Sequence, residues 1–202
     1  MAIVLWHNYQ RRGGLLFVLS GPSGVGKDRL LGEFLRIAPN VRRCVTTTTR
    51  PPRNAECDGV DYWFVEMSEF RRMVDAGEFL EHAEVHGNFY GVERRHVEEL
   101  LAAGHDVILL IDVQGAATVK RWRPDATMVF LAPPSMEELE RRLRERGTES
   151  ENEIAVRLSN AVGEFQRVNE FDYLIVHDSV EDAARQLAAI VTAERCRIER
   201  SV

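Results

Sequence analysis

The sequence lacks the features that mark secreted, membrane-spanning and nucleic-acid-binding proteins. Its 202 residues hold three cysteines, Cys44, Cys57 and Cys196, whose wide spacing fits neither a disulfide framework nor a zinc motif, so we expect a reducing cytoplasm. The apolar run near the N-terminus ends at Trp6, far too soon for a signal-peptide core or a membrane span. The net charge of −6 argues against a basic face for nucleic acid.

The composition is that of a soluble globular protein. Apolar residues make up 45% of the chain and charged residues 29%, which suffices for one ordinary core with one or two smaller lobes. Residues 1–13 combine the short apolar run with polar and basic residues, and we expect a loosely held tail there. The rest of the sequence contains no internal repeat and no low-complexity linker.

The chain is organised around a glycine-rich loop at residues 21–28. It follows the apolar run 15–19 and precedes a helical pattern that starts at Arg29, so a strand, a turn and a helix follow one another. Its first seven residues fit GxxxxGK, in which backbone N–H groups and the lysine bind a polyphosphate. The helix N-terminus attracts anions as well. The expected nucleotide-binding residues are Gly21, Pro22, Ser23, Gly24, Val25, Gly26, Lys27 and Asp28.

The last position of this loop departs from the usual pattern. A Ser or Thr normally stands there and offers its hydroxyl to Mg²⁺, whereas this chain has Asp28. A carboxylate at this place either binds the metal directly or repels the phosphates, and the loop alone leaves both interpretations open.

Apolar strands alternate with amphipathic helices along most of the chain. Strands are predicted at 43–47, 106–112, 126–132 and 171–177, and helices at 136–146, 151–168 and 182–197. This alternation predicts an α/β fold with a three-layer, doubly wound parallel sheet made of residues 14–46 and 105–202.

Residues 47–104 interrupt the alternation with short strands and turns. We expect them to form an inserted lobe that faces the phosphate loop across a cleft. The arginine-rich helices within residues 136–168 are expected to form a mobile lid.

Arginines in these two regions are candidate phosphate ligands. Prolines stiffen the loop that carries Arg50 and Arg53, which suits a bidentate grip on one phosphate. Arg142 and Arg146 are four residues apart and share a helix face, so both can reach one polyphosphate. Arg157, on the next helix, completes the set. Convergent arginines together with Mg²⁺ neutralise charge during phosphoryl transfer.

Asp112 ends the apolar run 106–112. Ligands bind at the carboxyl edge of open α/β sheets, and this edge places Asp112 beside the phosphate loop. A buried structural aspartate is the alternative, but the position at the strand end favours a metal or substrate role.

Six motifs resemble those of guanylate kinases, over nearly the whole chain from Leu15 to about Arg197. They are GPSGVGK at 21–27, TTRPPR at 48–53, DYWFV at 61–65, FLEHAEVHGNFYG at 79–91, IDVQGA at 111–116 and RGTES at 146–150. The resemblance implies a P-loop core, a GMP-binding lobe at 47–104 and a helical lid at about 136–168. It also implies phosphorylation of GMP and dGMP by ATP with Mg²⁺, in purine nucleotide metabolism.

The resemblance also implies a role for each matching residue. Mg²⁺ is expected near Asp28 and Asp112. The lid arginines and His177 join the loop in the ATP site. The implied catalytic set is Lys27, Arg50, Arg142, Arg146 and Arg157. The implied GMP site comprises Thr46, Arg50, Arg53, Tyr62, Glu81, Tyr90, Val92 and Asp112.

Chemistry supports the place of Glu81 in the GMP site. Guanine presents N1–H and N2–H₂ donors that one carboxylate accepts together, whereas adenine has no such edge. Without the resemblance, a surface or salt-bridged glutamate is the simpler interpretation.

Four positions depart from the family pattern. Asp28 replaces the loop hydroxyl, and Leu110 stands where many relatives have the first carboxylate of an Asp-x-Asp pair. We hypothesise that one carboxylate replaced the other, which leaves the charge of the metal site unchanged. Val92 replaces a Ser or Thr that helps to bind guanine, which removes a hydrogen bond worth about 1 kcal/mol. His177 replaces an Asn that often meets adenine.

Two other functions stay open. The GKD ending of the loop and the triplet at 90–92 also resemble ribose 1,5-bisphosphate phosphokinase, although a sugar phosphate does not require Tyr62, Glu81 and Asp112. A non-catalytic guanylate-kinase-like module that binds phosphopeptides is expected to have a decayed loop, whereas Lys27 and the glycines remain. We expect ATP and GMP as small-molecule partners, no nucleic acid, no membrane, and a monomer or homodimer.

Overall fold

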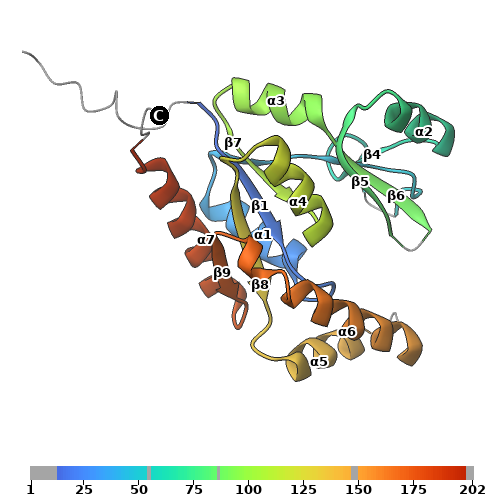
Figure 1. The fold of residues 1–202 in the computed structure, drawn as a ribbon, viewed down its shortest axis with the longest axis vertical. Helices are drawn as coiled ribbons and strands as arrows, with labels where there is room; N and C mark the ends of the chain where they lie inside the picture. The colour runs from blue at the N-terminus through green and yellow to red at the C-terminus, as the bar shows by residue number, and fades with distance from the viewer. Residues whose placement is uncertain (1–12, 54–55, 86, 147–149, 199–202) are drawn as a thin grey trace, which may run out of the picture.

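A five-stranded parallel sheet forms the centre of the protein (Figure 1). The computed structural model describes residues 13–53, 56–85, 87–146 and 150–198, so nearly all of the expected tail at 1–13 lies outside the described residues. The pairings within the sheet are all parallel, as predicted. In spatial order its strands are β2 (Val41–Arg43), β7 (Asp106–Leu110), β1 (Leu16–Ser20), β8 (Thr127–Ala132) and β9 (Tyr173–Val176).

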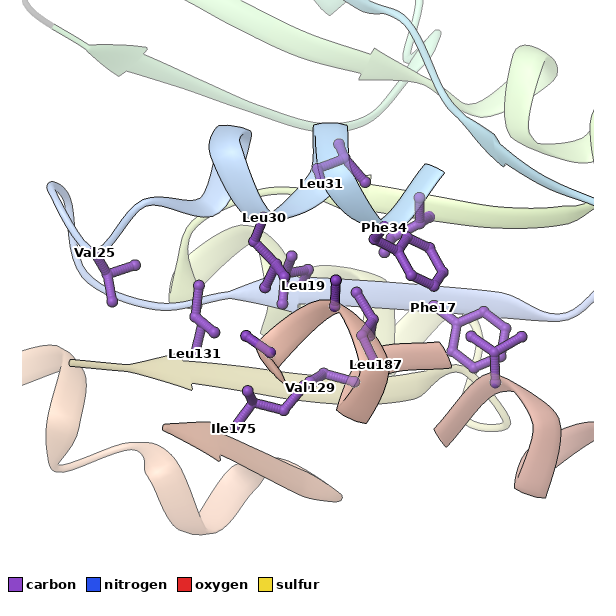
Figure 2. Packing of buried hydrophobic residues seen from close by; sticks show 14 of the residues in the cluster. Phe17, Leu19, Val25, Leu30, Leu31, Phe34, Val129, Leu131, Ile175 and Leu187 are labelled. Carbon is purple, nitrogen blue, oxygen red and sulfur yellow. The ribbon is translucent and has the colours of Figure 1, made fainter. Parts of the chain in front are cut away.

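One face of the sheet is covered by α1 (Lys27–Ile37) and α7 (Val180–Arg195). Phe17 and Leu19 of β1 point into this layer, because alternate residues of a strand face opposite sides. Figure 2 shows them among apolar side chains of both helices and of the neighbouring strands, including Leu30, Phe34, Leu187, Val129 and Leu131.

The opposite face is covered by α3 (Arg94–Ala102) and α4 (Val113–Trp122). Leu16 and Val18 of β1 belong to this second cluster, so the central strand is buried on both sides. The predicted three-layer α/β core is therefore confirmed. None of the helices in the described ranges is long and apolar enough to cross a bilayer.

A second sheet lies beside the core, at the upper right of Figure 1. Its order is β4 (Tyr62–Phe64), β3 (Thr46–Thr48), β6 (Asn88–Glu93) and β5 (Phe79–Val85). Helix α2 (Met67–Asp75) closes it with a small apolar cluster, in which the rings of Phe70 and Phe79 stack at 4.5 Å between centroids.

Residues 43–47 do not form the single strand that their sequence predicts. Arg43 ends β2 in the parallel sheet, whereas Thr46 begins β3 in the second sheet. The chain crosses between the sheets at residues 44 and 45, where the buried side chain of Cys44 joins the second core cluster. Strand propensity does not tell which partner strand lies nearby, and this is why the split was not predicted.

Helices α5 (Met136–Arg146) and α6 (Glu151–Phe165) form a pair at the lower right of Figure 1. Apolar residues of both helices belong to the first core cluster, among them Leu139, Leu143, Ile154 and Ala161. Ser150 and Glu153 form a capping box at the start of α6. A short 3-10 turn, Val168–Glu170, then leads to β9.

Helix α4 is a helix that the sequence pattern did not predict. Its N-cap is Asp112, whose Oδ1 accepts hydrogen bonds from the N–H groups of Gln114 at 2.9 Å and Gly115 at 2.8 Å. Asp112 is half-buried and caps α4, and it follows the end of β7.

Asp106 connects three elements at the amino edge of the parallel sheet. Its buried carboxylate accepts the Leu15 N–H at 2.8 Å and the Arg195 Nε–H at 2.8 Å, and it contacts a second nitrogen of Arg195. The start of β7, the residue before β1 and the end of α7 are thus joined by one side chain.

We predict that Asp106→Ala lowers the free energy of unfolding by about 2 to 3 kcal/mol, because the Leu15 N–H and the Arg195 guanidinium lose their partner in a largely buried place. Urea denaturation measures this change. Asp125→Ala is the matched control, since it removes the partner of Arg123 in an exposed pair. Equal shifts of the two midpoints would contradict the connecting role of Asp106.

Candidate active site

A cavity of about 860 Å³ lies at the carboxyl edge of the parallel sheet, where ligands bind in such folds. The phosphate loop, the second sheet, the end of β7 and α6 all contribute to its lining. The predicted site residues that line it are Gly21, Ser23, Lys27, Asp28, Thr46, Tyr62, Glu81, Tyr90, Asp112 and Arg157.

The loop is shaped by glycines in left-handed conformations. The φ angles are 143° at Gly21, 91° at Gly24 and 99° at Gly26. A Cβ at Gly24 would lie 2.5 Å from Leu143 Cδ2, and one at Gly26 would lie 2.7 Å from His177 Cε1. Both the backbone conformation and the close packing therefore require glycine at these two positions.

Lys27 begins α1 and is held at the loop by backbone carbonyls. Its Nζ donates hydrogen bonds to Gly21 O at 2.5 Å and to Pro22 O at 3.1 Å. Asp28 and Leu110 line the same cavity as Lys27 and Asp112. The two positions of the proposed carboxylate exchange thus belong to one site.

His177 and Arg142 support the backbone of the loop. His177 is 4% exposed, and its Nδ1 lies 2.7 Å from Val25 O, which fits a hydrogen bond donated by Nδ1. Arg142 donates to Val25 O at 3.2 Å and to His177 O at 2.9 Å, and pairs with Glu138 at 2.7 Å. Burial is the main cause that lowers the pKa of His177, which favours the neutral ring. Within the described part of the chain, neither residue lines the cavity.

Arg157 and Arg146 are the other two candidate arginines of the expected lid. Arg157 Nη1 donates to Ser23 Oγ at 2.5 Å, so α6 contacts the phosphate loop directly. Arg146 ends α5, but its side chain lies outside the described residues, as does most of the motif at 146–150.

Arg50 is oriented by Glu56. Its two terminal nitrogens donate to the two carboxylate oxygens at 2.9 and 3.0 Å, and only 11% and 19% of the two side chains are exposed. Glu56 also accepts the backbone N–H of Arg53 at 2.7 Å. The hydrogen bonds between the side chains of Arg50 and Glu56 are the main cause that raises the pKa of Arg50. Neither Arg50 nor Arg53 is among the described residues that line the cavity.

Three residues from the second sheet form one wall of the cavity. Thr46 of β3 lies beside Tyr62 of β4, and the rings of Tyr62 and Tyr90 pack edge to face at 6.1 Å between centroids. Three strands thus bring a hydroxyl and two phenol groups to the same wall.

Glu81 and Asp112 bring two carboxylates to the cavity from different sheets. Burial, and then the charge of Asp112, raise the pKa of Glu81 to about 7. A Cβ at Gly115 would lie 2.7 Å from Glu81 Oε2, so this glycine lets the carboxylate approach the start of α4. Because Asp112 caps α4 through Oδ1, the capping bonds leave its Oδ2 for another partner.

Val92 packs in the core instead of lining the described cavity. It is 1% exposed, and its neighbours in the apolar cluster include Leu80 and Val97. Its side chain therefore has neither a hydrogen-bonding group nor access to the cavity.

Sequence reasoning missed several residues of the lining. Asn160 and Glu164 follow Arg157 at steps of three and four along α6, so helical periodicity was the signal that could have found them, whereas Arg167 lies just after the end of this helix. Among the described residues, Glu164 Oε2 is buried without a hydrogen-bond partner, and burial is the main cause that raises the pKa of this carboxyl. No motif marks Arg43, which also lines the cavity.

The parallel sheet, the glycine loop with its lysine and the second sheet across a cavity define a P-loop nucleoside monophosphate kinase fold.

Comparison with known proteins agrees with this class and narrows it. A family model described as guanylate kinase matches residues 14–194. The chain is 46% identical over 191 residues to the guanylate kinase of Desulfitobacterium hafniense (strain Y51), covering 95% of this chain and 96% of that protein. It is 48% identical over 188 residues to the guanylate kinase of Symbiobacterium thermophilum, covering 93% and 89%.

A solved structure shows the same similarity. The crystal structure of guanylate kinase from Anaplasma phagocytophilum superposes with a TM-score of 0.74 at 36% sequence identity, covering 93% of this chain and 89% of that chain. The chain belongs to the guanylate kinase family.

We predict that Gly24→Ala lowers ATP affinity by about tenfold, because a left-handed conformation costs an L-residue about 1–2 kcal/mol and the new Cβ overlaps Leu143. Calorimetric titration with ATP measures the change. Gly32→Ala is the control, since a Cβ at Gly32 in α1 meets no heavy atom within 4 Å. An unchanged affinity in Gly24→Ala would show that the loop tolerates another shape.

Proposed function

We propose that this chain transfers the γ-phosphoryl group of ATP to GMP and dGMP, giving ADP with GDP or dGDP, in cytoplasmic purine nucleotide metabolism. The observation that supports this most is the shared cavity, which is lined both by the phosphate loop with Lys27 and by the carboxylates of Glu81 and Asp112. The similarity to proteins named guanylate kinase supports the same reaction.

In this proposal the loop binds the donor. Its N–H groups, the N-terminus of α1 and the ammonium of Lys27 attract the phosphates of ATP. Arg157, which already contacts Ser23, lies close enough to the loop to stabilise charge on the transferred group. Arg142 and Arg146 join when the lid, residues 136–168, closes and excludes water.

The second sheet supplies the acceptor site. We propose that the carboxylate of Glu81 accepts hydrogen bonds from N1–H and N2–H₂ of guanine, with Asp112 beside it. Arg50, Arg53 and the two tyrosines then bind the phosphate. Residues 47–104 act as the GMP-binding lobe, while residues 14–46 and 105–202 act as the core. We also expect a monomer or homodimer, without nucleic-acid or membrane partners.

The residues at the loop fit Mg²⁺ brought with ATP. Mg²⁺ usually takes one or two protein carboxylates together with substrate phosphates and water. Asp28 and Asp112 line the same cavity, and no group of three or more His, Cys, Asp or Glu side chains in the described ranges forms a metal site by itself. We propose that these two carboxylates hold the ion, which neutralises charge on the donor phosphates.

We predict that GMP and dGMP are phosphorylated, whereas AMP and UMP are not, because neither base presents the paired donors that Glu81 accepts. A coupled assay of ADP release with these four nucleotides and ribose 1,5-bisphosphate measures the preference. Activity confined to the sugar bisphosphate would replace the proposed acceptor. Inactivity with all five compounds would favour a phosphopeptide-binding module.

We predict that GMP affinity rises by about tenfold between pH 6 and pH 8, because the Glu81 carboxyl, with a pKa of about 7, must lose its proton before it accepts hydrogen bonds from guanine. Binding titrations at several pH values measure this rise.

Glu81→Gln should bind GMP at least about tenfold more weakly at pH 8, with ATP affinity unchanged. Its remaining pH dependence should come only from the phosphate group, which ionises near pH 6. Glu84→Gln is the matched control on the same strand and the same cavity. An equal loss of ATP and GMP binding in Glu81→Gln would contradict recognition of the base by Glu81.

A further inference from the structure

Arg43 is an arginine of the cavity to which the proposed function assigns no role. It is the last residue of β2, so it lies at the carboxyl edge of the parallel sheet, as do the phosphate loop after β1 and Asp112 after β7. In register, Arg43 is paired with Ile108 of β7, and its side chain lines the cavity.

The guanidinium of Arg43 is not committed to another group of the protein. Within the described ranges it makes no hydrogen bond and no ion pair, and its recorded contact is with the ring of Tyr62, whose centroid lies 5.7 Å from Cζ. A guanidinium carries five N–H donors and no acceptor. A half-buried cation of this kind is suited to an anion that a ligand brings.

Arg50 contacts the same ring as Arg43, but it has a carboxylate partner and does not line the described cavity. Its Cζ lies 5.3 Å from the Tyr62 centroid, but its charge is balanced by the two oxygens of Glu56. It also does not line the described cavity, whereas Arg43 and Tyr62 do. Unlike Arg50, Arg43 therefore brings to the cavity a positive charge that no carboxylate of the described residues pairs with.

We propose that Arg43 binds the phosphate group of the acceptor directly, as a third arginine beside Arg50 and Arg53. This inference rests on the proposed function, since it takes a nucleoside monophosphate as the acceptor. A bidentate grip by Arg43 strengthens recognition of the phosphate. Affinity for the acceptor then depends more on its phosphate and less on its base.

The alternative is that Arg43 only packs on Tyr62 and joins the parallel sheet to the second sheet through a cation–π contact. The two roles differ in what they do to an acceptor that has no phosphate. Loss of a phosphate ligand weakens GMP alone, whereas loss of a packing contact weakens GMP and guanosine together.

The test is calorimetric titration of Arg43→Met with GMP, guanosine and ATP, together with steady-state kinetics. We expect the Kd and KM for GMP to rise about 10- to 100-fold, as for the loss of a charge-assisted hydrogen bond. The Kd for guanosine, the Kd for ATP and kcat at saturating GMP should each change less than about threefold.

Arg42→Met is the matched control on the same strand. Arg42 is exposed, and its guanidinium donates to Pro39 O at 2.5 Å and Val41 O at 3.3 Å, away from the cavity lining. It should leave GMP affinity unchanged. Arg43→Lys keeps the charge without the planar fork, so its loss of GMP affinity should lie between those of wild type and Arg43→Met.

Several outcomes would overturn the proposal. They are unchanged GMP affinity in Arg43→Met, an equal loss for GMP and guanosine, or an equal effect of Arg42→Met. If Arg43→Met fails to bind ATP because it is unfolded, the ratio of GMP to guanosine affinity in Arg43→Lys decides in the same way. A wild-type protein that binds but does not phosphorylate GMP would refute the proposed function, while the Arg43 comparison would still decide phosphate binding.

Discussion

The geometry of the whole site depends on the tight packing of side chains around the phosphate loop. Leu131 of β8, Leu143 of α5 and His177 after β9 lie so close to the loop glycines that no Cβ fits there. These neighbours are themselves buried by the packing of the central sheet. The protein core therefore fixes the shape of the loop before any nucleotide arrives, which reduces the entropy lost on binding.

Several charged groups of the site are balanced within the protein. Glu56 neutralises Arg50, the carbonyls of the loop hold Lys27, and burial favours the protonated form of Glu81. Each of these arrangements satisfies a group that would otherwise be desolvated without a partner. Under the proposed function, substrate binding at these groups exchanges partners within the protein for partners on the substrate, so the net gain in free energy is smaller than the sum of the new contacts.

Local patterns predicted the fold well, because β1, β7 and β8 are continuous apolar runs and the glycine loop has its own signature. The cavity residues Thr46, Tyr62 and Tyr90 were identified through the family motifs. What could not be predicted depends on tertiary neighbours. The crossing at Cys44 depends on which sheet lies nearby, α4 depends on capping by Asp112, and the place of Arg142 under the loop depends on His177. The place of Arg43 in the cavity was not predicted for the same reason.

The parallel strands also keep the contacts that stabilise the fold apart from the cavity. Asp106 ties the fold together at the amino edge of the sheet, whereas the cavity lies at the carboxyl edge of the same strands. Substitutions at one edge therefore have little direct contact with groups at the other. Leu15 and Arg195, the partners of Asp106, lie outside the second sheet, so the lining that this sheet supplies can change without removing the tie at Asp106. Under the proposed function, the stability of the fold and the choice of acceptor can therefore evolve independently.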